Sequence, residues 1–275
     1  MKKLIFSAVI LSFVLTSCSK YQINMLSSTN TVKDEQTGNF DMVNDSVKIS
    51  YSFYGVNAPV KIQVYNKMDK PLYVDWQRSA AIIGEKVISY ATGEIPIKGN
   101  ITTDSYKLDR TTSISYGDIN AVATLPKDVS FIPPHAQISK TLFNITKGFI
   151  NVADSNMKVV EMHYIDEEHN VKEIKVKSAS FSKEASPLAF KSYLTVYIAE
   201  STGNKAINYQ HEFYVSNLIS TGTNPKNLED FQAKRGDYFI NTKKTGYAKV
   251  MTGAGIAAAV GAVAATSAMT TDNHK

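Results

Sequence analysis

The sequence predicts an all-β protein built as a β-sandwich, followed by a C-terminal tail rich in Ala and Gly. Between residues 46 and 240, apolar and polar residues alternate in many short runs, which is the pattern of half-buried strands. Gly, Pro, Asn and Asp separate these runs at short intervals, as they do in sandwiches. The chain has a single cysteine, Cys18, so no intrachain disulfide can form and a hydrophobic core must stabilise the fold.

Residues 1–17 have the form of a bacterial secretory signal peptide. Lys2 and Lys3 give a positive start, and the apolar run Leu4–Val14 is too short to span a bilayer. The sequence "LTSC" that ends at Cys18 resembles the lipobox of bacterial lipoproteins. The resemblance implies diacylglycerol on the thiol of Cys18, cleavage before this residue, and acylation of the new amino terminus, for example with palmitate. The alternative is that Cys18 is merely a small residue near a conventional cleavage site.

The charge of the chain is mildly basic and consists almost wholly of lysine. The formal net charge is +5, and removal of the signal peptide with Lys2 and Lys3 lowers it by two. The positive charges are scattered along the chain, so we expect no nucleic-acid partner. Arginine occurs only at Arg78, Arg110 and Arg235, so bidentate clamps on phosphate or carboxylate groups are scarce.

Residues 18–45 are predicted to form a lipidated tether, because Ser, Thr, Asn and Asp are frequent in them. One apolar patch, Tyr21–Leu26, is a candidate strand. The sandwich is predicted to occupy residues 46–148 and to begin with the strands "SVKISYSFYG" and "VKIQVYN". The turn Lys67–Pro71 then leads into "LYVDW", which predicts a hairpin. Further candidate strands are "AAIIG", "EKVISY", "TSISYG", "DVSFI" and "QISKTLFNI".

Residues 149–240 are predicted to add further β hairpins or a second sandwich. "MKVVEMHYI" and "VKEIKVKSASF" flank an acidic hairpin loop at Asp166–Asn170. "SYLTVYIAES" and "AINYQHEFYVSNLI" form another pair around a turn at Gly203 and Asn204. The pattern is compatible with a second small sheet and with strands at the edges of the first, and therefore with one compound sandwich or two small ones.

One short helix is predicted within "NPKNLEDFQAKRG". Asn224 is a suitable cap and Pro225 suits the first helical position. Gly236 supplies a stop.

The tail, residues 250–271, is an uncharged segment that is long enough to cross a bilayer as a transmembrane helix. Ala and Gly dominate it, so we expect an insertion free energy near zero. Gly253, Ala257 and Gly261 recur at every fourth position, a spacing that lets helices approach closely. The segment resembles the glycine-zipper segments of some bacterial envelope proteins, which implies a packing face and a homo-oligomer. The alternative is an Ala-rich tail of no defined function.

The charges around the tail conflict with the signal peptide. Lys243, Lys244 and Lys249 precede the tail, so the positive-inside rule would place the β-domain in the cytoplasm, which the lipobox forbids. We therefore expect the tail to insert, if it inserts, in an outer membrane or as a bundle of tails from several copies. Ser19 stands where an acidic residue would favour the inner membrane, and resemblance to Gram-negative lipoproteins implies transport to the outer membrane.

The ionisable residues suggest no catalytic, cofactor or metal site. The five histidines fall in different segments without paired spacing, and no G-x-S-x-G elbow or phosphate loop is present. His211 and Glu212 are predicted to point to opposite faces of one strand. His169 beside Asp166, Glu167 and Glu168 is the best loose cluster; it could bind a hard cation, or it is simply a solvated hairpin loop.

Trp76, Tyr73 and Tyr90 are candidates for a sugar-binding platform. A lone tryptophan in a strand is more often a core residue, and we favour the core for Trp76.

Three phrases resemble repeated phrases of uncharacterised lipoproteins from the Bacteroidota: "YNKMDKPLYVDWQRSAAI", "SFIPPHAQISKT" and "SPLAFKSYLTVYI". The resemblance covers most of Val47–Val215. It implies an immunoglobulin-like sandwich and an outer-membrane location, and it supplies no catalytic residue. The chain is also similar to fimbrillin-type pilins, which are lipoproteins of two β-sandwiches cleaved after an arginine well beyond the lipidated cysteine. This chain has no arginine before Arg78, which counts against a pilin matured in that way.

We therefore expect a non-enzymatic outer-membrane lipoprotein that acts as a binding or scaffolding module in the cell envelope. Its domain would face the periplasm or the cell surface, and it would use no cofactor. The expected partners are the membrane, through the lipid and the tail, an envelope protein or glycan, and further copies of the chain. The alternative function is a fimbrillin-like pilin or adhesin subunit.

Overall fold

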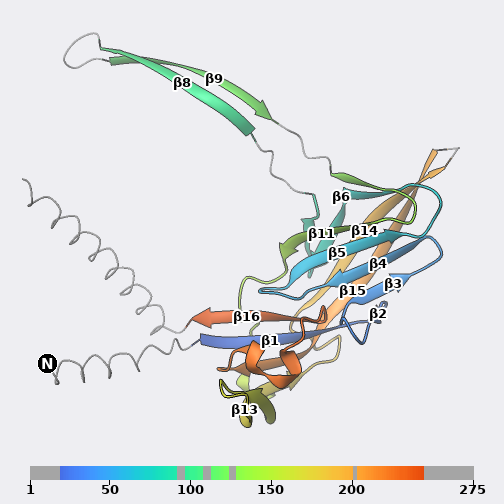
Figure 1. The fold of residues 1–275 in the computed structure, drawn as a ribbon, viewed down its shortest axis with the longest axis vertical. Coiled ribbons are helices and arrows are strands. Elements are labelled where there is room, and N and C mark those ends of the chain that lie inside the picture. Colours follow the sequence, from blue (N-terminus) through green and yellow to red (C-terminus); the bar gives the residue numbers. More distant parts are fainter. Residues whose placement is uncertain (1–18, 92–96, 108–112, 124–127, 201–202, 245–275) are drawn as a thin grey trace, which may run out of the picture.

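A computed structural model of the chain describes residues 19–91, 97–107, 113–123, 128–200 and 203–244 (Figure 1). These residues confirm the predicted all-β class, because most of them lie in strands of two antiparallel sheets. Buried side chains from both sheets form one core, so the sheets pack as a sandwich.

The larger sheet contains nine strands in the order β10-β6-β14-β15-β1-β16, with β7 paired to β6, and with β13 paired to both β15 and β12. Its strands are β1 (Ser19–Ser28), β6 (Leu72–Ile83), β7 (Lys86–Ser89), β10 (Val129–Ile132), β12 (Lys158–Ile165), β13 (Val171–Ser180), β14 (Ala189–Glu200), β15 (Gly203–Thr221) and β16 (Tyr238–Lys244). The long strand β15 connects the two halves of this sheet, because it pairs with β14 at one end and with β13 at the other.

The smaller sheet has the order β11-β5-β4-β3-β2. Its strands are β2 (Val32–Lys33), β3 (Phe40–Val43), β4 (Val47–Ser52), β5 (Pro59–Asn66) and β11 (Gln137–Asn144). Alternate residues of β4 and β5 are buried, as the period-two pattern of the sequence predicts.

Two further strands, β8 (Ile97–Lys107) and β9 (Ser113–Ala123), pair with each other along their whole length. Neither pairs with another described strand. In Figure 1 this hairpin lies apart from the two sheets.

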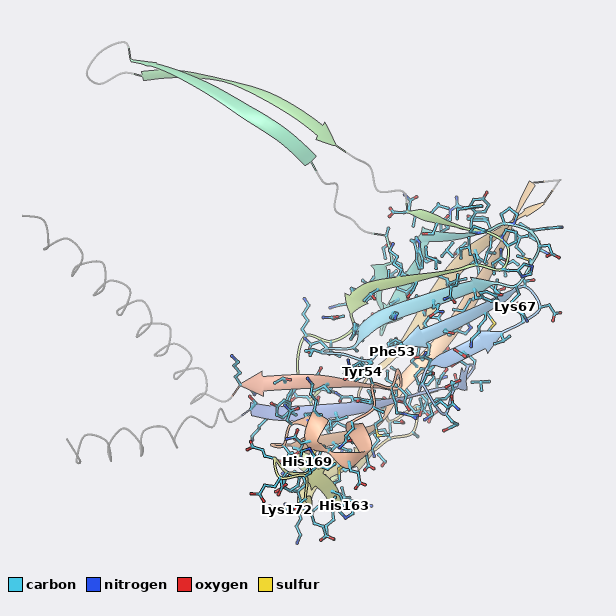
Figure 2. All side chains as sticks on the ribbon, in the orientation of Figure 1. Phe53, Tyr54, Lys67, His163, His169 and Lys172 are labelled. Atoms are coloured by element: carbon cyan, nitrogen blue, oxygen red, sulfur yellow. The ribbon has the colours of Figure 1, made fainter. Side chains whose placement is uncertain are left out.

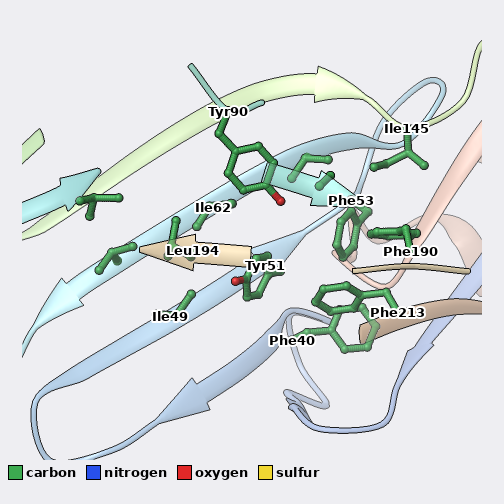
Figure 3. Close-up of a cluster of buried hydrophobic side chains, with 14 of the residues drawn as sticks. Phe40, Ile49, Tyr51, Phe53, Ile62, Tyr90, Ile145, Phe190, Leu194 and Phe213 are labelled. Atoms are coloured by element: carbon green, nitrogen blue, oxygen red, sulfur yellow. The ribbon is translucent and has the colours of Figure 1, made fainter. Parts of the chain in front are cut away.

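The core between the sheets contains a cluster of aromatic rings (Figure 3). Phe213 of β15 lies at its centre, and its ring centroid is 4.9 to 5.4 Å from those of Phe53, Tyr51, Phe40 and Phe190. Most of these rings meet edge-on or tilted, which is the arrangement that aromatic quadrupoles favour. The cluster joins the larger sheet to β3 and β4 of the smaller one.

A second, smaller apolar cluster lies on the part of the larger sheet that contains β1, β12, β13 and β16. It contains Ile23 of β1, Val176 of β13 and Ile219 of β15, and Leu228 and Phe231 cover it. Phe231 belongs to the short 3-10 turn η3 (Glu229–Phe231), and Leu228 lies between η3 and the preceding turn η2 (Pro225–Asn227).

The predicted helix after Asn224 is therefore wrong in type and length. Asn224 does cap η2, since its side chain accepts a hydrogen bond from the backbone of Lys226, and Pro225 begins the turn. Two single turns follow. Leu228 lies between them and Phe231 ends the second, and both side chains pack in the same apolar cluster.

The hairpin predicted around Lys67–Pro71 is also wrong. β5 pairs with β4 and β11 in the smaller sheet, whereas β6 pairs with β14, β10 and β7 in the larger one. The turn carries the chain from one sheet to the other. Both strands are amphipathic, and alternation alone does not tell whether two consecutive strands share a sheet.

The prediction of a tether over residues 18–45 needs correction as well. The candidate strand Tyr21–Leu26 is present, but it belongs to β1, which begins at Ser19 and pairs with β15 on one side and β16 on the other. β2 and β3 follow it within the same range. Apart from Cys18, which lies outside the described residues, the segment is part of the sandwich.

The division at residue 148 does not separate two sandwiches. β14 and β15 lie in the middle of the same sheet as β6. Of the two arrangements compatible with the sequence, one compound sandwich or two small ones, the structure has the first. The predicted acidic hairpin loop at Asp166–Asn170 is confirmed between β12 and β13. Gly203 and Asn204 already belong to β15 and pair with the end of β14.

The signal peptide, Cys18 and the tail with Gly253, Ala257 and Gly261 lie outside the described residues. Within the described residues, no helix has the length and hydropathy needed to cross a membrane.

Candidate functional site

A cavity with a strongly basic lining lies at the end of the larger sheet where β1 begins and β16 ends. Its volume is about 480 Å³. Four lysines, one acidic residue, Ser220 and Thr221 line it, together with the segment that precedes β12. The basic cavity, as we call it, is lined by Lys20, Gln22, Phe149, Ile150, Asn151, Val152, Asp154, Met157, Lys175, Val176, Lys177, Ser220, Thr221, Gly222 and Lys243.

The sheet register brings the lysines together. Lys177 is opposite Ser220, Ser220 is opposite Gln22, and Gln22 is opposite Asn241, so these four residues form a row across β13, β15, β1 and β16. Alternation by two residues along each strand then places Lys175, Lys20 and Lys243 on the same face, one row further out. Lys20 and Lys243 are direct cross-strand partners.

The buried amide of Gln22 lines the cavity, and a second buried amide, that of Asn241, bonds to it. Gln22 is 4% exposed; its Oε1 accepts a hydrogen bond from the backbone N–H of Ile150 at 2.7 Å, and its Nε2 donates to the carbonyl of Ile150 at 2.9 Å. Asn241 is fully buried; its Nδ2 donates to Gln22 Oε1 at 3.3 Å, and its Oδ1 accepts from Thr146 Oγ1 at 3.0 Å. These bonds hold the segment 146–150 across the face of the sheet, so the cavity has a fixed wall.

The charge of the cavity is largely uncompensated. Lys177 pairs with Asp154 at 3.1 Å, and both side chains are exposed. No carboxylate of the described residues lies within ion-pair distance of Lys20, Lys175 or Lys243. Like charges that face each other across a strand pair are destabilising, so the opposition of Lys20 and Lys243 works against folding until an anion is bound.

The chemistry available in the basic cavity is that of anion binding. Lysine ammonium groups act as point charges for phosphate or carboxylate groups, and Ser220 adds a hydroxyl group on the same face. Among the described residues, the lining contains no histidine or cysteine, and its single carboxylate, that of Asp154, pairs with Lys177. The groups that line the cavity are therefore suited to binding an anion.

A second cavity, of about 520 Å³, lies beneath η3 on the opposite face of β1 and β16. Its walls are mainly apolar and include Met25, Met162 and Ile219. Asp237 at its rim is already bound by Arg235 at 3.0 Å and by Lys33 at 3.4 Å. This cavity offers volume, but its polar groups are satisfied by one another, so it supplies little basis for recognising a ligand.

The acidic loop that could have held a cation is organised by the protein itself. Asp166 accepts hydrogen bonds from the backbone of Glu168 and Asn170 and pairs with Lys172 at 2.6 Å. The hydrogen bond from Lys172 and then that from Asn170 lower the pKa of Asp166 to about 2. His169 has a left-handed backbone, with φ of 64°, and lies exposed at the turn (Figure 2). Across the described residues, no group of three or more His, Cys, Asp or Glu side chains could hold a metal ion.

Trp76 is a core residue, as favoured from the sequence. Its side chain is 1% exposed, its Nε1 donates to Ser130 Oγ at 2.8 Å, and the ammonium of Lys140 lies 4.6 Å from the ring centroid. Tyr90 is also buried, and only Tyr73 of the three candidate platform residues is partly exposed. These residues do not form a sugar platform.

His211 and Glu212 point to opposite faces of β15, as predicted. His211 is 3% exposed, and its Nδ1 lies 2.9 Å from the hydroxyl of Tyr51. Burial lowers the pKa of His211 to about 4, so the imidazole is neutral in the folded protein at pH 7. Glu212 faces outward, where hydrogen bonds from Lys183 and Lys191 lower its pKa to about 2.

Sequence reasoning missed the basic cavity. The nearest signal is the spacing of Lys175 and Lys177 in "VKEIKVKSASF", which places both on one face of a strand. Nothing local relates that strand to Lys20 or Lys243.

Comparison with known proteins gives no relative for this chain. No protein-family model, no curated protein sequence and no solved structure matches it.

Proposed function

We propose that the chain is a non-enzymatic lipoprotein of the bacterial outer membrane, and that its β-sandwich is held directly against the bilayer as a binding or scaffolding module. The observation that carries the proposal is the position of β1. The strand begins at Ser19, the residue that follows Cys18, and pairs on both sides within the larger sheet. An acyl chain on Cys18 is thereby attached to the sandwich without a spacer.

The absence of a spacer sets the distance between the domain and the lipid. A flexible tether over residues 18–45 could extend to about 90 Å, whereas one extended residue spans only about 3.5 Å. With lipid on Cys18, the end of the sandwich that carries Ser19 lies at the membrane surface. The domain would have little freedom to move away from it.

The other end of the described chain supports the same orientation. Ser19 is the cross-strand partner of Lys244, so β1 begins and β16 ends side by side (Figure 1). Ser19 follows Cys18 in the sequence, and Lys244 precedes the segment that leads to the tail. The lipidation site and the tail are therefore connected to neighbouring ends of two paired strands. A lipid before β1 and an apolar tail after β16 would act on one membrane.

The finer parts of the proposal rest on sequence resemblance. The sandwich is proposed to be immunoglobulin-like, with a helical tail, and to face the periplasm or the cell surface, where it binds an envelope protein or glycan. Two antiparallel sheets around a common core are compatible with that class.

Metabolic labelling with palmitate tests the proposal. Wild-type protein should take up label and fractionate with the outer membrane, whereas Cys18→Ala should take up none and accumulate as an unprocessed precursor. A matched control moves the thiol: Cys18→Ala combined with Ser28→Cys keeps one cysteine outside the lipobox and should stay unlabelled. Absence of label from the wild type would refute the lipoprotein.

A further inference from the structure

We propose that the basic cavity binds a phosphate-bearing anion, and that the headgroup of an anionic phospholipid is its natural source. The binding site rests on the cavity itself. The membrane as the source of the phosphate rests on the proposed function, because that proposal places Ser19 and its neighbour Lys244 at the bilayer surface.

Four exposed lysines give the cavity an excess of positive charge. Lys20, Lys175 and Lys243 line the cavity without a carboxylate partner among the described residues. Lys20 and Lys243 face each other across β1 and β16. An anion between them converts a repulsion into two attractions, so the folded protein gains stability when it binds one.

Ser220 places a neutral hydrogen-bond donor beside the lysines. Ser220 lies opposite Lys177 in the sheet, so its hydroxyl group is on the lysine face, and Thr221 and Gly222 also line the cavity. A side chain built on Gly222 would meet no atom within 4 Å, so the space above this residue is open to a ligand. Phosphate oxygens accept several hydrogen bonds at once and suit such a mixture of ammonium and hydroxyl donors.

The size and shape of the cavity suit a small anionic group. The volume of about 480 Å³ lies within the range of roughly 300 to 1,000 Å³ typical of small-molecule sites. The segment 149–157 closes one side of the cavity, and the bonds between Gln22 and Ile150 fix it there. A closed side favours a compact headgroup over a continuous polyanion, which would need an open groove.

The cavity lies at the end of the sandwich that is proposed to face the membrane. The cavity includes Lys20, which is two residues from Cys18, and Lys243, which precedes the last described residue. Lipid headgroups are therefore the phosphates nearest to the cavity when Cys18 carries its acyl chains. Juxtamembrane lysines also gain from the negative surface potential of anionic leaflets.

The test uses the chain from Ser19 to Lys275, which keeps every described residue and lacks residues 1–18, the signal peptide and the acylated cysteine. Free-ligand binding is measured by calorimetry with glycerol phosphate. Membrane binding is measured by co-sedimentation with vesicles of phosphatidylcholine alone and of phosphatidylcholine mixed with phosphatidylglycerol. Binding to phosphatidylcholine alone reports any contribution of the tail, and the variants share that contribution.

The informative variant is Lys20→Gln combined with Lys243→Gln. Its control is Lys70→Gln combined with Lys86→Gln, which removes the same charge from two exposed lysines outside the cavity. The cavity variant should bind glycerol phosphate and phosphatidylglycerol vesicles about 20-fold more weakly than wild type, whereas the control should bind within about twofold. Thermal unfolding shows whether both variants are folded; a cavity variant that unfolds is replaced by Lys175→Gln, whose side chain is exposed.

Each outcome decides between the parts of the proposal. Cavity-dependent binding to both ligands supports the headgroup site. Cavity-dependent binding of glycerol phosphate alone supports the site and overturns its lipid source. Equal losses in both double variants mean general charge attraction and overturn the proposal, as does the absence of any binding. None of these results depends on palmitate labelling, so the lipoprotein proposal can fail separately.

Discussion

His211 and Tyr51 join the two sheets of the sandwich through a hydrogen bond inside the core. Tyr51 comes from β4 and His211 from β15, and the Tyr51 hydroxyl also accepts from Ser192 Oγ at 3.2 Å. Tyr90 donates to the same Ser192 oxygen at 2.8 Å. Burial raises the pKa values of Tyr51 and Tyr90, so both remain neutral at physiological pH. The network satisfies polar groups that would otherwise be costly in an apolar core.

This network predicts that the protein loses stability when the pH falls from about 6.5 to about 4. Unfolded histidine binds a proton near pH 6.5, whereas the pKa of His211 in the folded protein is lowered to about 4, so protons favour the unfolded chain in that window. The loss attributable to His211 amounts to at most about 3 kcal/mol. Chemical unfolding of wild type and His211→Gln at several pH values measures it.

The carboxylates should act at lower pH. The pKa of Glu212 is lowered from 4.5 to about 2 by Lys183 and Lys191, so its contribution is present above about pH 4.5 and is lost between there and pH 2. The wild type should therefore show an acid-induced loss above pH 4.5 that is reduced in His211→Gln. Parallel curves for the two proteins from pH 6.5 to 4.5 would mean that His211 does not control this step.

At the scale of elements, the loop that borders the basic cavity depends on one buried side chain. Gln22 makes two hydrogen bonds with the backbone of Ile150 and one with Asn241. Gln22→Ala should reduce the free energy of unfolding by about 1 to 3 kcal/mol, because it leaves buried polar groups without partners. Urea unfolding measures the loss. Hydrogen exchange at Ile150 should also accelerate.

Gln63→Ala is the matched control for that substitution. Gln63 bonds Gln137 across β5 and β11 in an exposed position, so its loss should change stability by less than about 0.5 kcal/mol. Equal effects of the two substitutions would remove the special role given to Gln22.

Individual elements were predictable where the reason for them is local. The strands around Val47–Asn66 follow from alternation, and the loop at Asp166–Asn170 follows from its turn residues. The pairing of these strands was less accessible: β5 and β6 are consecutive in the chain but lie in different sheets. A two-residue period reports that one face of a strand is buried and says nothing of its neighbour.

β1 shows the same limit in another form. Its sequence is rich in polar residues, and Gln22 and Asn24 interrupt the apolar pattern, so the sequence predicts only one candidate strand, Tyr21–Leu26, within a tether. Both residues are buried in the sandwich. Gln22 is satisfied there by Ile150, which lies far along the chain, and only the folded structure brings that partner within reach.

At the scale of the whole molecule, the end of the larger sheet combines features that are separate in the sequence. The start of β1, the end of β16 and the lysines of β13 come together through strand pairings with β15 and β1. The candidate site therefore could not be predicted from any single segment. Trp76 could, because its burial depends on the alternation of its own strand.

The proposed function requires this end of the sandwich to lie against the membrane that holds the lipid. The mature chain offers a direct test, since its only cysteine is Cys18 and acylation consumes that thiol. A single introduced cysteine can therefore be labelled specifically. Lys244→Cys marks the proposed membrane end, and Lys67→Cys marks the turn between β5 and β6 at the far end of the molecule (Figure 2).

The decisive measurement is fluorescence quenching of these two labels by nitroxide groups on lipid headgroups, with the acylated protein reconstituted in vesicles. We expect strong quenching of the label at position 244 and little quenching at position 67. Cys18 directly precedes Ser19, and Ser19 is the cross-strand partner of Lys244. Equally weak quenching at both positions would refute this placement, because it would mean that the sandwich lies away from the bilayer.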